Sequence, residues 1–249
     1  MRLKLNTSKT ELIWFDRRSR SHLDLKTLSL QLDETCSIQP SNVVRDLGVL
    51  FDSKLSMSNH IGSITKACFF HLRRIRQIKR CLNEHCLHVL VHSLVFSRID
   101  YCNSVLYGLP KSTLSPLTSV IHAAARLVKN LSFKDHISQS LRELHWLPIQ
   151  ARISFKICLL MFKIMSGTAP PYLSSLVTPC VTLESRRGLR SASKGNFIVK
   201  RTNQQFGNRT FEVAGPAEWN SLPELIRRSS SINTFKTKLK THLFSKYYD

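Results

Sequence analysis

The stretch Ile149–Gly167, IQARISFKICLLMFKIMSG, carries the clearest helical pattern of the chain. Isoleucine and leucine recur in it every three or four residues, which places them on one face of a helix. These positions are Ile149, Ile153, Ile157, Leu160 and Ile164. Pro148 suits the residue before the first turn, and Gly167 is a typical stop. The stretch therefore predicts an amphipathic helix with a strong preference for burial.

The same period continues upstream of this helix. From Ser58 the apolar positions fall on one helical face. They are Ile61, Ile64, Cys68, Leu72, Ile75 and Leu82. Asn83 is a plausible N-cap for the next helix, whose run LHVLVHSLVF (87–96) is apolar nearly all round and is expected to be buried. A third helix is predicted through Leu114, Leu117, Ile121, Ala124 and Val128. Together these segments predict a bundle of four or five helices.

The two ends of the chain show different patterns. Short apolar or alternating runs over Glu11–Phe15, Leu28–Leu32 and Val43–Phe51, the last broken at Gly48, predict strands of a small sheet or hairpin. After residue 180 a polar, basic stretch predicts a linker or arm. Beyond it we expect two short strands, Asn196–Arg201 and Arg209–Ala214, and a final basic amphipathic helix that begins at Asn233.

The expected fold is thus mainly α with a small β part. The predicted divisions are a β-hairpin region (1–57), a helical bundle (58–180), a basic linker (181–208) and a small α+β C-terminal region (209–249).

Charge is the strongest compositional signal. With 37 Lys and Arg against 16 Asp and Glu, the 249-residue chain has a net charge of +21, which favours a polyanionic partner, nucleic acid before membrane. No apolar run approaches the roughly 18 residues needed to span a bilayer, and no signal-peptide pattern precedes the first strand. We therefore expect an intracellular protein with no membrane partner, nuclear or cytoplasmic, and reduced cysteines.

Candidates for chemistry are few. The sequence has no Gly-rich phosphate loop, no GxSxG and no HExxH motif, and it contains no adjacent Asp-Asp pair. Polymerase chemistry needs converging carboxylates that hold paired Mg²⁺ ions. The segment CLNEHCLHVLVH (81–92) contains the possible zinc ligands Cys81, His85, Cys86, His88 and His92. A closed structural zinc site usually takes a second pair of ligands from another segment, and the sequence shows no such pair. We predict packing roles for these side chains, no metal site and no cofactor.

Basic residues are more informative. HLRRIRQIKR (71–80) contains five cations, interleaved with Ile75 and Ile78, which are expected to tie the helix to a core. A rigid helix of this kind can hold side chains in place for binding phosphate groups. For any single residue, a role on a solvated helix face is an equal alternative. The cations are Arg73, Arg74, Arg76, Lys79 and Arg80. Weaker candidates are the arm residues Arg186, Arg187 and Arg190, and the row Lys236, Lys238 and Lys240.

The order of several motifs resembles the C-terminal part of the reverse transcriptase of non-LTR retrotransposons, of the jockey or chicken-repeat LINE kind. The motifs cover essentially the whole chain. They are LNTSKTE (5–11), VVRDLGVLFDSKLSMSNHI (43–61), FSRIDYCNSVLYGLP (96–110), LHWLPIQARISFKICLLMFKIMSGTAPPYL (144–173) and AGPAEWNSLPELIRRSSSINTFKTKLKTHLF (214–244).

This resemblance implies roles for particular residues. Lys9 matches a motif lysine that in related polymerases lies near the incoming triphosphate, and here it is at most vestigial. Leu47, Gly48 and Val49 match the primer-grip hairpin, and the helices from Ser58 onward match the thumb that holds the template–primer duplex. Trp146, Pro148, Trp219 and Pro223 match positions of the C-terminal region, where we expect packing and turn roles.

The chain departs from the family because the fingers, most of the palm and the metal-binding Asp-Asp strand have no counterpart in its sequence. We expect a truncated protein with Met1 as an internal methionine, no catalysis of its own, and Mg²⁺ only in the full-length parent. The predicted activity is weak, sequence-independent binding of RNA or of an RNA–DNA duplex. The alternative is a non-catalytic helical interaction or structural protein with incidental charge. The sequence leaves the oligomeric state open.

Overall fold

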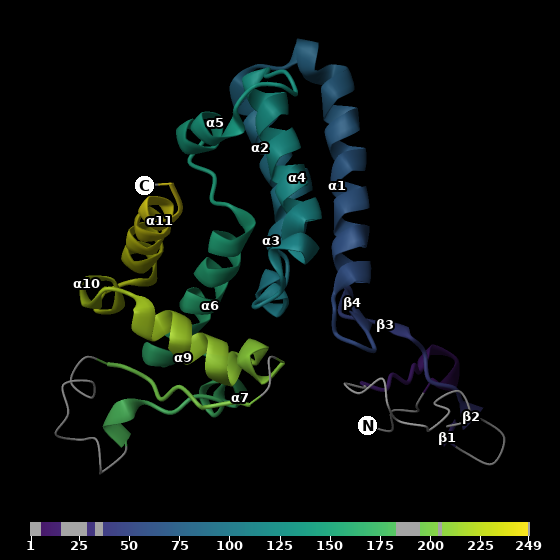
Figure 1. Cartoon of the computed structure of the whole chain (residues 1–249), viewed down its shortest axis with the longest axis vertical. Coiled ribbons are helices and arrows are strands. Elements are labelled where there is room, and N and C mark those ends of the chain that lie inside the picture. The colour runs from purple at the N-terminus through teal and green to yellow at the C-terminus, as the bar shows by residue number, and fades with distance from the viewer. Residues whose placement is uncertain (1–5, 16–28, 33–36, 183–194, 204–205, 249) are drawn as a thin grey trace. The chain divides into compact units, whose positions relative to one another are not determined.

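The computed structural model describes residues 6–15, 29–32, 37–182, 195–203 and 206–248, and helices dominate these residues (Figure 1). The chain divides into two compact units, one up to Ala67 and one from Cys68 onward. The division falls within helix α1 (Ser58–Ile78). The expected fold class, mainly α with a small β part, is confirmed.

The first unit contains the predicted hairpin. Strands β3 (Val43–Asp46) and β4 (Val49–Asp52) are antiparallel. Leu47 and Gly48 form the turn between them, with φ angles of 44° and 86°. Two consecutive positive φ angles are typical of a type I′ turn, whose twist matches that of the strands it joins. The break predicted at Gly48 is therefore the tip of a hairpin, and Val49 is buried directly after it.

The remaining strand predictions in this unit are only partly right. A short 3₁₀ turn, η1 (Thr7–Lys9), precedes a single bridge between Leu12 and Pro40, so the strand expected over Glu11–Phe15 is wrong in extent. Proline cannot donate a backbone hydrogen bond, which limits pairing at such an edge. Strands β1 (Leu30–Gln31) and β2 (Ser37–Ile38) form a second antiparallel pair.

Asp52 organises the entry into α1. Its buried carboxylate accepts hydrogen bonds from the backbone N–H groups of Lys54 at 3.2 Å, Ser56 at 2.9 Å and Met57 at 2.7 Å. Met57 lies in the left-handed region with φ 61°. The carboxylate meets backbone donors that would otherwise lack partners, and so fixes the turn at which Ser58 begins the helix.

The second unit is built from helices joined by short turns. Its first part contains the 3₁₀ turn η2 (Lys79–Cys81), α2 (Glu84–Val91), the π-helical turn η3 (His92–Phe96), α3 (Ser97–Asp100), the 3₁₀ turn η4 (Asn103–Leu106), α4 (Lys111–Lys129) and α5 (Ile137–Glu143). Its second part contains α6 (Ile149–Met165), α7 (Pro171–Ser174), the 3₁₀ turns η5 (Cys180–Thr182) and η7 (Gly207–Arg209), α9 (Phe211–Ser221), α10 (Glu224–Arg227) and α11 (Ile232–Tyr248).

Several sequence predictions hold in this unit. The Asn83 side chain accepts a hydrogen bond from the Cys86 backbone N–H at 2.8 Å, as expected of an N-cap. All five apolar positions predicted for the third helix are buried in α4. The run LHVLVHSLVF, however, is buried on one face only, because Val89 is 50% exposed and Ser93 also faces solvent.

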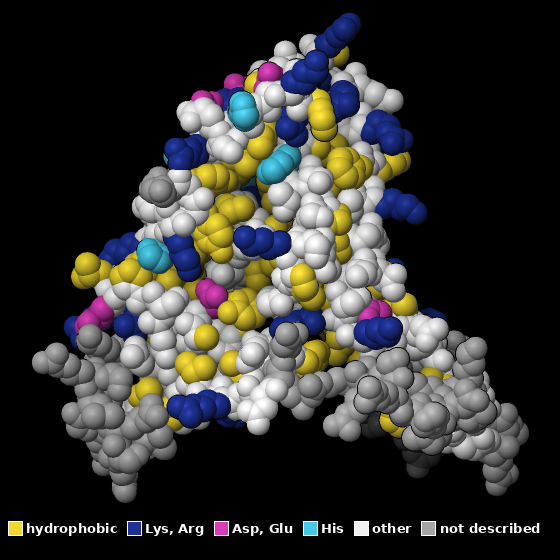
Figure 2. Space-filling view, viewed as in Figure 1, with side chains coloured by type: hydrophobic (Ala, Val, Ile, Leu, Met, Phe, Trp, Pro, Cys, Tyr) yellow, Lys and Arg dark blue, Asp and Glu magenta, His cyan; other side chains and the backbone are white. Residues whose placement is uncertain are grey.

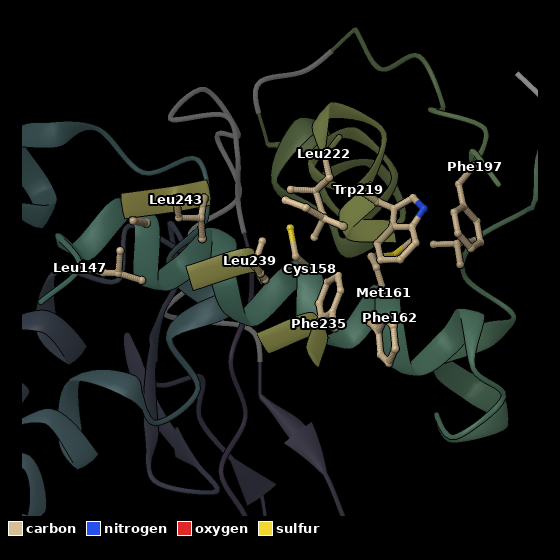
Figure 3. Close-up of a cluster of buried hydrophobic side chains, with 13 residues drawn as sticks. Leu147, Cys158, Met161, Phe162, Phe197, Trp219, Leu222, Phe235, Leu239 and Leu243 are labelled. Atoms are coloured by element: carbon tan, nitrogen blue, oxygen red, sulfur yellow. The ribbon is translucent and has the colours of Figure 1, made fainter. Parts of the chain in front are cut away.

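Helix α6 carries the main core (Figure 3). Side chains from α6, α9 and α11 converge there. They include Cys158, Met161, Phe162, Trp219, Phe235, Leu239 and Leu243, and Leu222 joins them directly after α9. Gly215 allows α9 to approach α6 closely, since a Cβ at that position would lie 2.7 Å from the Met161 sulfur. The helix predicted from Ile149–Gly167 is thus the centre of the fold.

The C-terminal region differs from its prediction. Arg209–Ala214 is not a strand, because α9 begins at Phe211 and buries Val213, Ala214 and Trp219. Burial of this face overrides the strand propensity of its Phe and Val residues. In Asn196–Arg201, Phe197 forms one isolated bridge with Pro179. The final helix begins at Ile232, one residue before its predicted start.

Candidate nucleic-acid interface

Five predicted cations lie at the C-terminal end of α1 and in η2. Arg73, Arg74, Arg76 and Arg80 are exposed, and Lys79 is half-buried. In the view of Figure 2, Lys and Arg side chains gather along the outer edge of this part of α1. Leu72 and Ile75 are buried beneath them. The predicted anchoring role of Ile78 is wrong, because its side chain is 49% exposed.

These cations are not neutralised within the described chain. Among its residues, ion pairs within 4.0 Å involve Lys129, Arg152, Lys200 and Arg228, and none of the five cations of α1 and η2. Arg74 lies over the Phe70 ring, with its guanidinium carbon 5.6 Å from the ring centre. Exposed cations without acidic partners keep their charge available for an external anion.

A groove of about 810 Å³ lies between this end of α1 and the C-terminal half of α4. Arg76 and Lys79 line it from α1 and η2, and Arg126 lines it from α4. Of the described residues that line it, none is Asp or Glu. The Lys79 amine donates a hydrogen bond to the Asn130 side-chain oxygen at 2.9 Å, which links the two walls. We call this feature the α1–α4 groove.

Aromatic side chains flank the cations of the groove. Phe69 is 38% exposed and Phe133 is 88% exposed, although both are large apolar groups. The Arg126 guanidinium carbon lies 5.3 Å from the centre of the Phe133 ring. Its Nε is buried and has no hydrogen-bond partner in the described chain. Cations together with accessible aromatic rings are the usual components of a surface that binds single-stranded nucleic acid.

One titratable group also lies in the groove. Burial, and secondarily the Arg126 charge, lowers the pKa of His122 below its ordinary value of 6.5. His122 is therefore neutral at pH 7 and contributes hydrogen-bonding atoms rather than charge. The positive potential of the groove thus comes from Arg76, Lys79 and Arg126.

Sequence reasoning missed half of this groove. Arg126 belongs to the predicted third helix, on the side opposite its predicted apolar face, and Phe133 follows in a short loop. Neither residue stands in a basic run, so only the packing of α4 beside α1 reveals them. Arg73, Arg74 and Arg80 lie outside the groove lining and extend the basic surface along α1.

The other predicted site residues lie elsewhere. Arg186, Arg187 and Arg190 fall outside the described residues. Lys9 ends η1 in the first unit with an exposed side chain. Leu47, Gly48 and Val49 form the tip of the hairpin in the same unit. Their matches to polymerase motifs stay predictions.

The histidines of CLNEHCLHVLVH take part in an aromatic cluster. The His88 and His92 rings stack with centres 5.2 Å apart, and both meet the edge of Trp146, at 5.3 and 5.9 Å. His85 is exposed. Within the described ranges, no group of three His, Cys, Asp or Glu side chains is arranged to hold a metal ion. Trp146 and Trp219 are both buried, in agreement with the packing roles expected of them.

Acidification is expected to destabilise the second unit through this cluster. Burial lowers the pKa of His88 and of His92 below 6.5, and the neighbouring charges of Arg152 and Lys240 lower that of His92 further, while Asp100 opposes them. A depressed pKa in the folded state means that the unfolded chain binds more protons. This part of the stability is therefore present above pH 6.5 and is lost as the pH falls through the folded-state pKa.

Urea unfolding of the protein at several pH values on both sides of 6.5 measures this effect. The variant H88Q/H92Q should show a smaller loss of unfolding free energy on acidification than the wild type. His136 is exposed and provides the matched control H136Q. Equal pH dependence of H88Q/H92Q and the wild type would contradict the assignment.

Comparison with known proteins found no relative of this chain. The chain matches no family model, no curated protein and no solved structure. Among the described residues, no helix combines the length and the apolar character required to cross a membrane.

Proposed function

We propose that this chain binds RNA or an RNA–DNA duplex weakly and without sequence preference. Contact is made through the α1–α4 groove and the adjoining cations of α1. In this proposal the chain derives from the C-terminal part of a non-LTR retrotransposon reverse transcriptase and retains thumb-like binding. It does not catalyse nucleotide transfer alone.

One observation carries the binding proposal. Arg76, Lys79 and Arg126 line a single groove, its described lining includes no carboxylate, and accessible phenylalanines lie at its sides. Guanidinium and ammonium groups bind phosphate oxygens without reading bases, which explains the absence of sequence preference. Base stacking on phenylalanine is equally tolerant of sequence, because every base has an aromatic face.

The order of polymerase-like motifs supports the proposed origin. The hairpin at Leu47–Gly48 and the helices that follow it agree in secondary structure with a primer grip followed by a thumb. The catalytic part of the proposal rests on the sequence, which contains no adjacent Asp-Asp pair. Purified protein is therefore expected to give no primer extension with Mg²⁺.

Photo-crosslinking to a short single-stranded RNA tests where binding occurs. The proposal places crosslinked peptides in residues 69–80 and 119–133, which form the two walls of the groove. Crosslinks confined to α11, whose lysines are also exposed, would contradict it. A chain that forms no crosslink at low salt would contradict binding altogether.

Replacement of Phe133 by alanine is expected to weaken binding of single-stranded RNA. A base stacked on an aromatic side chain contributes about 1–3 kcal/mol, so the loss is about 5- to 150-fold in affinity. Bases of a duplex are stacked on one another, so F133A should affect an RNA–DNA duplex much less. Fluorescence anisotropy with both ligands measures the ratio, and Tyr172, 73% exposed and outside the groove, provides the control Y172A.

A protein-docking role is the second candidate. Phe69, Phe70 and Phe133 are exposed, and aromatic and arginine side chains are enriched at protein interfaces. The variant R73A/R74A/R76A separates the two functions. Loss of nucleic-acid binding supports the first, whereas unchanged nucleic-acid affinity with loss of a co-purifying protein supports the second.

A further inference from the structure

A second cavity, of about 320 Å³, shares no lining residue with the α1–α4 groove. It lies where the π-helical turn η3, the loop 144–147, α6 and α11 meet. Trp146 and Phe155 provide apolar walls, and Lys156 and Lys240 provide cations from α6 and α11. Its volume lies at the small end of the range of ligand sites, about 300–1,000 Å³.

Arg152 and Asp100 form a fixed pair in this cavity. The Arg152 guanidinium donates to both Asp100 oxygens, at 3.1 and 2.8 Å, and its Nε donates to the Leu147 carbonyl at 2.9 Å. The same guanidinium lies 4.0 Å from the centre of the Phe96 ring. The two charges offset one another, so Asp100 does not neutralise the two lysines. Within the described chain, neither lysine has a carboxylate within 4.0 Å.

Two buried polar groups of the lining lack hydrogen bonds. Trp146 and Asn103 are each 2% exposed, and within the described chain the Trp146 indole N–H and the Asn103 side-chain oxygen have no partner. Buried donors and acceptors in folded proteins are nearly always paired. Both residues line the cavity, so an unmet donor and an unmet acceptor lie within its wall and favour a polar occupant over an apolar one.

We propose that this cavity binds a small phosphate monoester carried on a flat ring. Lys156 and Lys240 match the two negative charges of the phosphate, and Trp146 and Phe155 contact the ring. The Trp146 indole and the Asn103 oxygen bind the polar edge of the ligand. His88 and His92 line the cavity beside it and can add hydrogen bonds. This inference is independent of the proposed nucleic-acid binding, because the two sites share no residue.

Indole N–H signals in ¹⁵N NMR spectra test the site on the intact chain. The sequence has three tryptophans, and W146F assigns the signal of interest. Titration with phenyl phosphate should shift the Trp146 signal saturably and leave those of Trp14 and Trp219 in place. Phenol, which lacks the phosphate, and inorganic phosphate, which lacks the ring, should each bind at least about tenfold more weakly. Adenosine monophosphate tests whether the ring is a nucleobase.

Lysine variants show whether the binding is local. K156A and K240A should each weaken phenyl phosphate binding about tenfold. K236A, an exposed lysine of α11 outside the cavity, should leave it unchanged. The inference is overturned if Trp146 does not respond, if phenol or inorganic phosphate binds as well as phenyl phosphate, or if K236A weakens binding as much as K240A. The wild-type ligand series decides the question even if a lysine variant folds poorly.

Discussion

Replacement of Trp219 by alanine is expected to destabilise the second unit by about 3–5 kcal/mol, the usual range for removing a buried tryptophan. Trp219 is fully buried between α6 and α11, where its ring lies 5.9 Å from that of Phe235 (Figure 3). Its indole N–H donates to the Gly195 carbonyl at 3.0 Å. Alanine leaves a cavity in the core and an unmet carbonyl at its edge.

Thermal and urea unfolding of W219A measure this loss. A loss of 1 kcal/mol lowers the melting temperature of a domain of this size by about 2–4 °C, so W219A is expected to melt at least about 6 °C lower than the wild type. The loss is a large share of the total, because domains are stable by only about 5–15 kcal/mol. Trp14 is 47% exposed, so W14A should change the unfolding free energy by no more than about 0.5 kcal/mol. An unfolding curve of W219A that coincides with the wild type would show that α9 does not pack on α6 as described.

Removal of three cations from α1 is expected to reduce nucleic-acid affinity by two to three orders of magnitude. Arg73, Arg74 and Arg76 are exposed and have no carboxylate partner in the described chain. A charge-assisted contact contributes about 1.5 kcal/mol at its lower limit, so three contacts correspond to a factor of about 10³, or somewhat less where one arginine stays in solvent.

The matched control removes equal charge elsewhere. In K236A/K238A/K240A three exposed lysines of α11 are lost, and the net charge falls from +21 to +18, as it does in R73A/R74A/R76A. Anisotropy with single-stranded RNA and with an RNA–DNA duplex compares them. If both variants bind equally weakly, affinity depends on net charge and the α1 surface is not a site.

Periodicity predicted the helices well because their apolar faces repeat over many turns. The face of α4 is buried as expected, and so are Ile149, Ile153 and Ile157 of α6. Errors occur where few residues carry the signal. The segment Arg209–Ala214 has only a short mixed pattern, and its packing onto α6 decides in favour of a helix. Val89 continues an apolar run, yet α2 presents it to solvent.

Half of the candidate site could be predicted from the sequence. Five cations in one run predicted the basic end of α1, where Arg73, Arg74, Arg76 and Arg80 are exposed and Lys79 is half-buried. The partners from α4 and the loop after it were not predictable, since Arg126 and Phe133 become part of a site only when α4 packs beside α1. Likewise, the spacing of His88 and His92 is compatible with metal binding, and only the position of Trp146 shows that the rings stack in an aromatic cluster.

Binding at the cations of α1 is best tested by measuring how RNA affinity depends on salt. Each phosphate contact on a single strand contributes a slope of about −0.7 to the plot of log affinity against log salt. For the wild type we expect a steep linear fall, and for R73A/R74A/R76A a slope smaller by about 2, because three contacts are lost. A wild-type affinity that does not change with salt, or identical slopes for the two proteins, would contradict binding at the cations of α1.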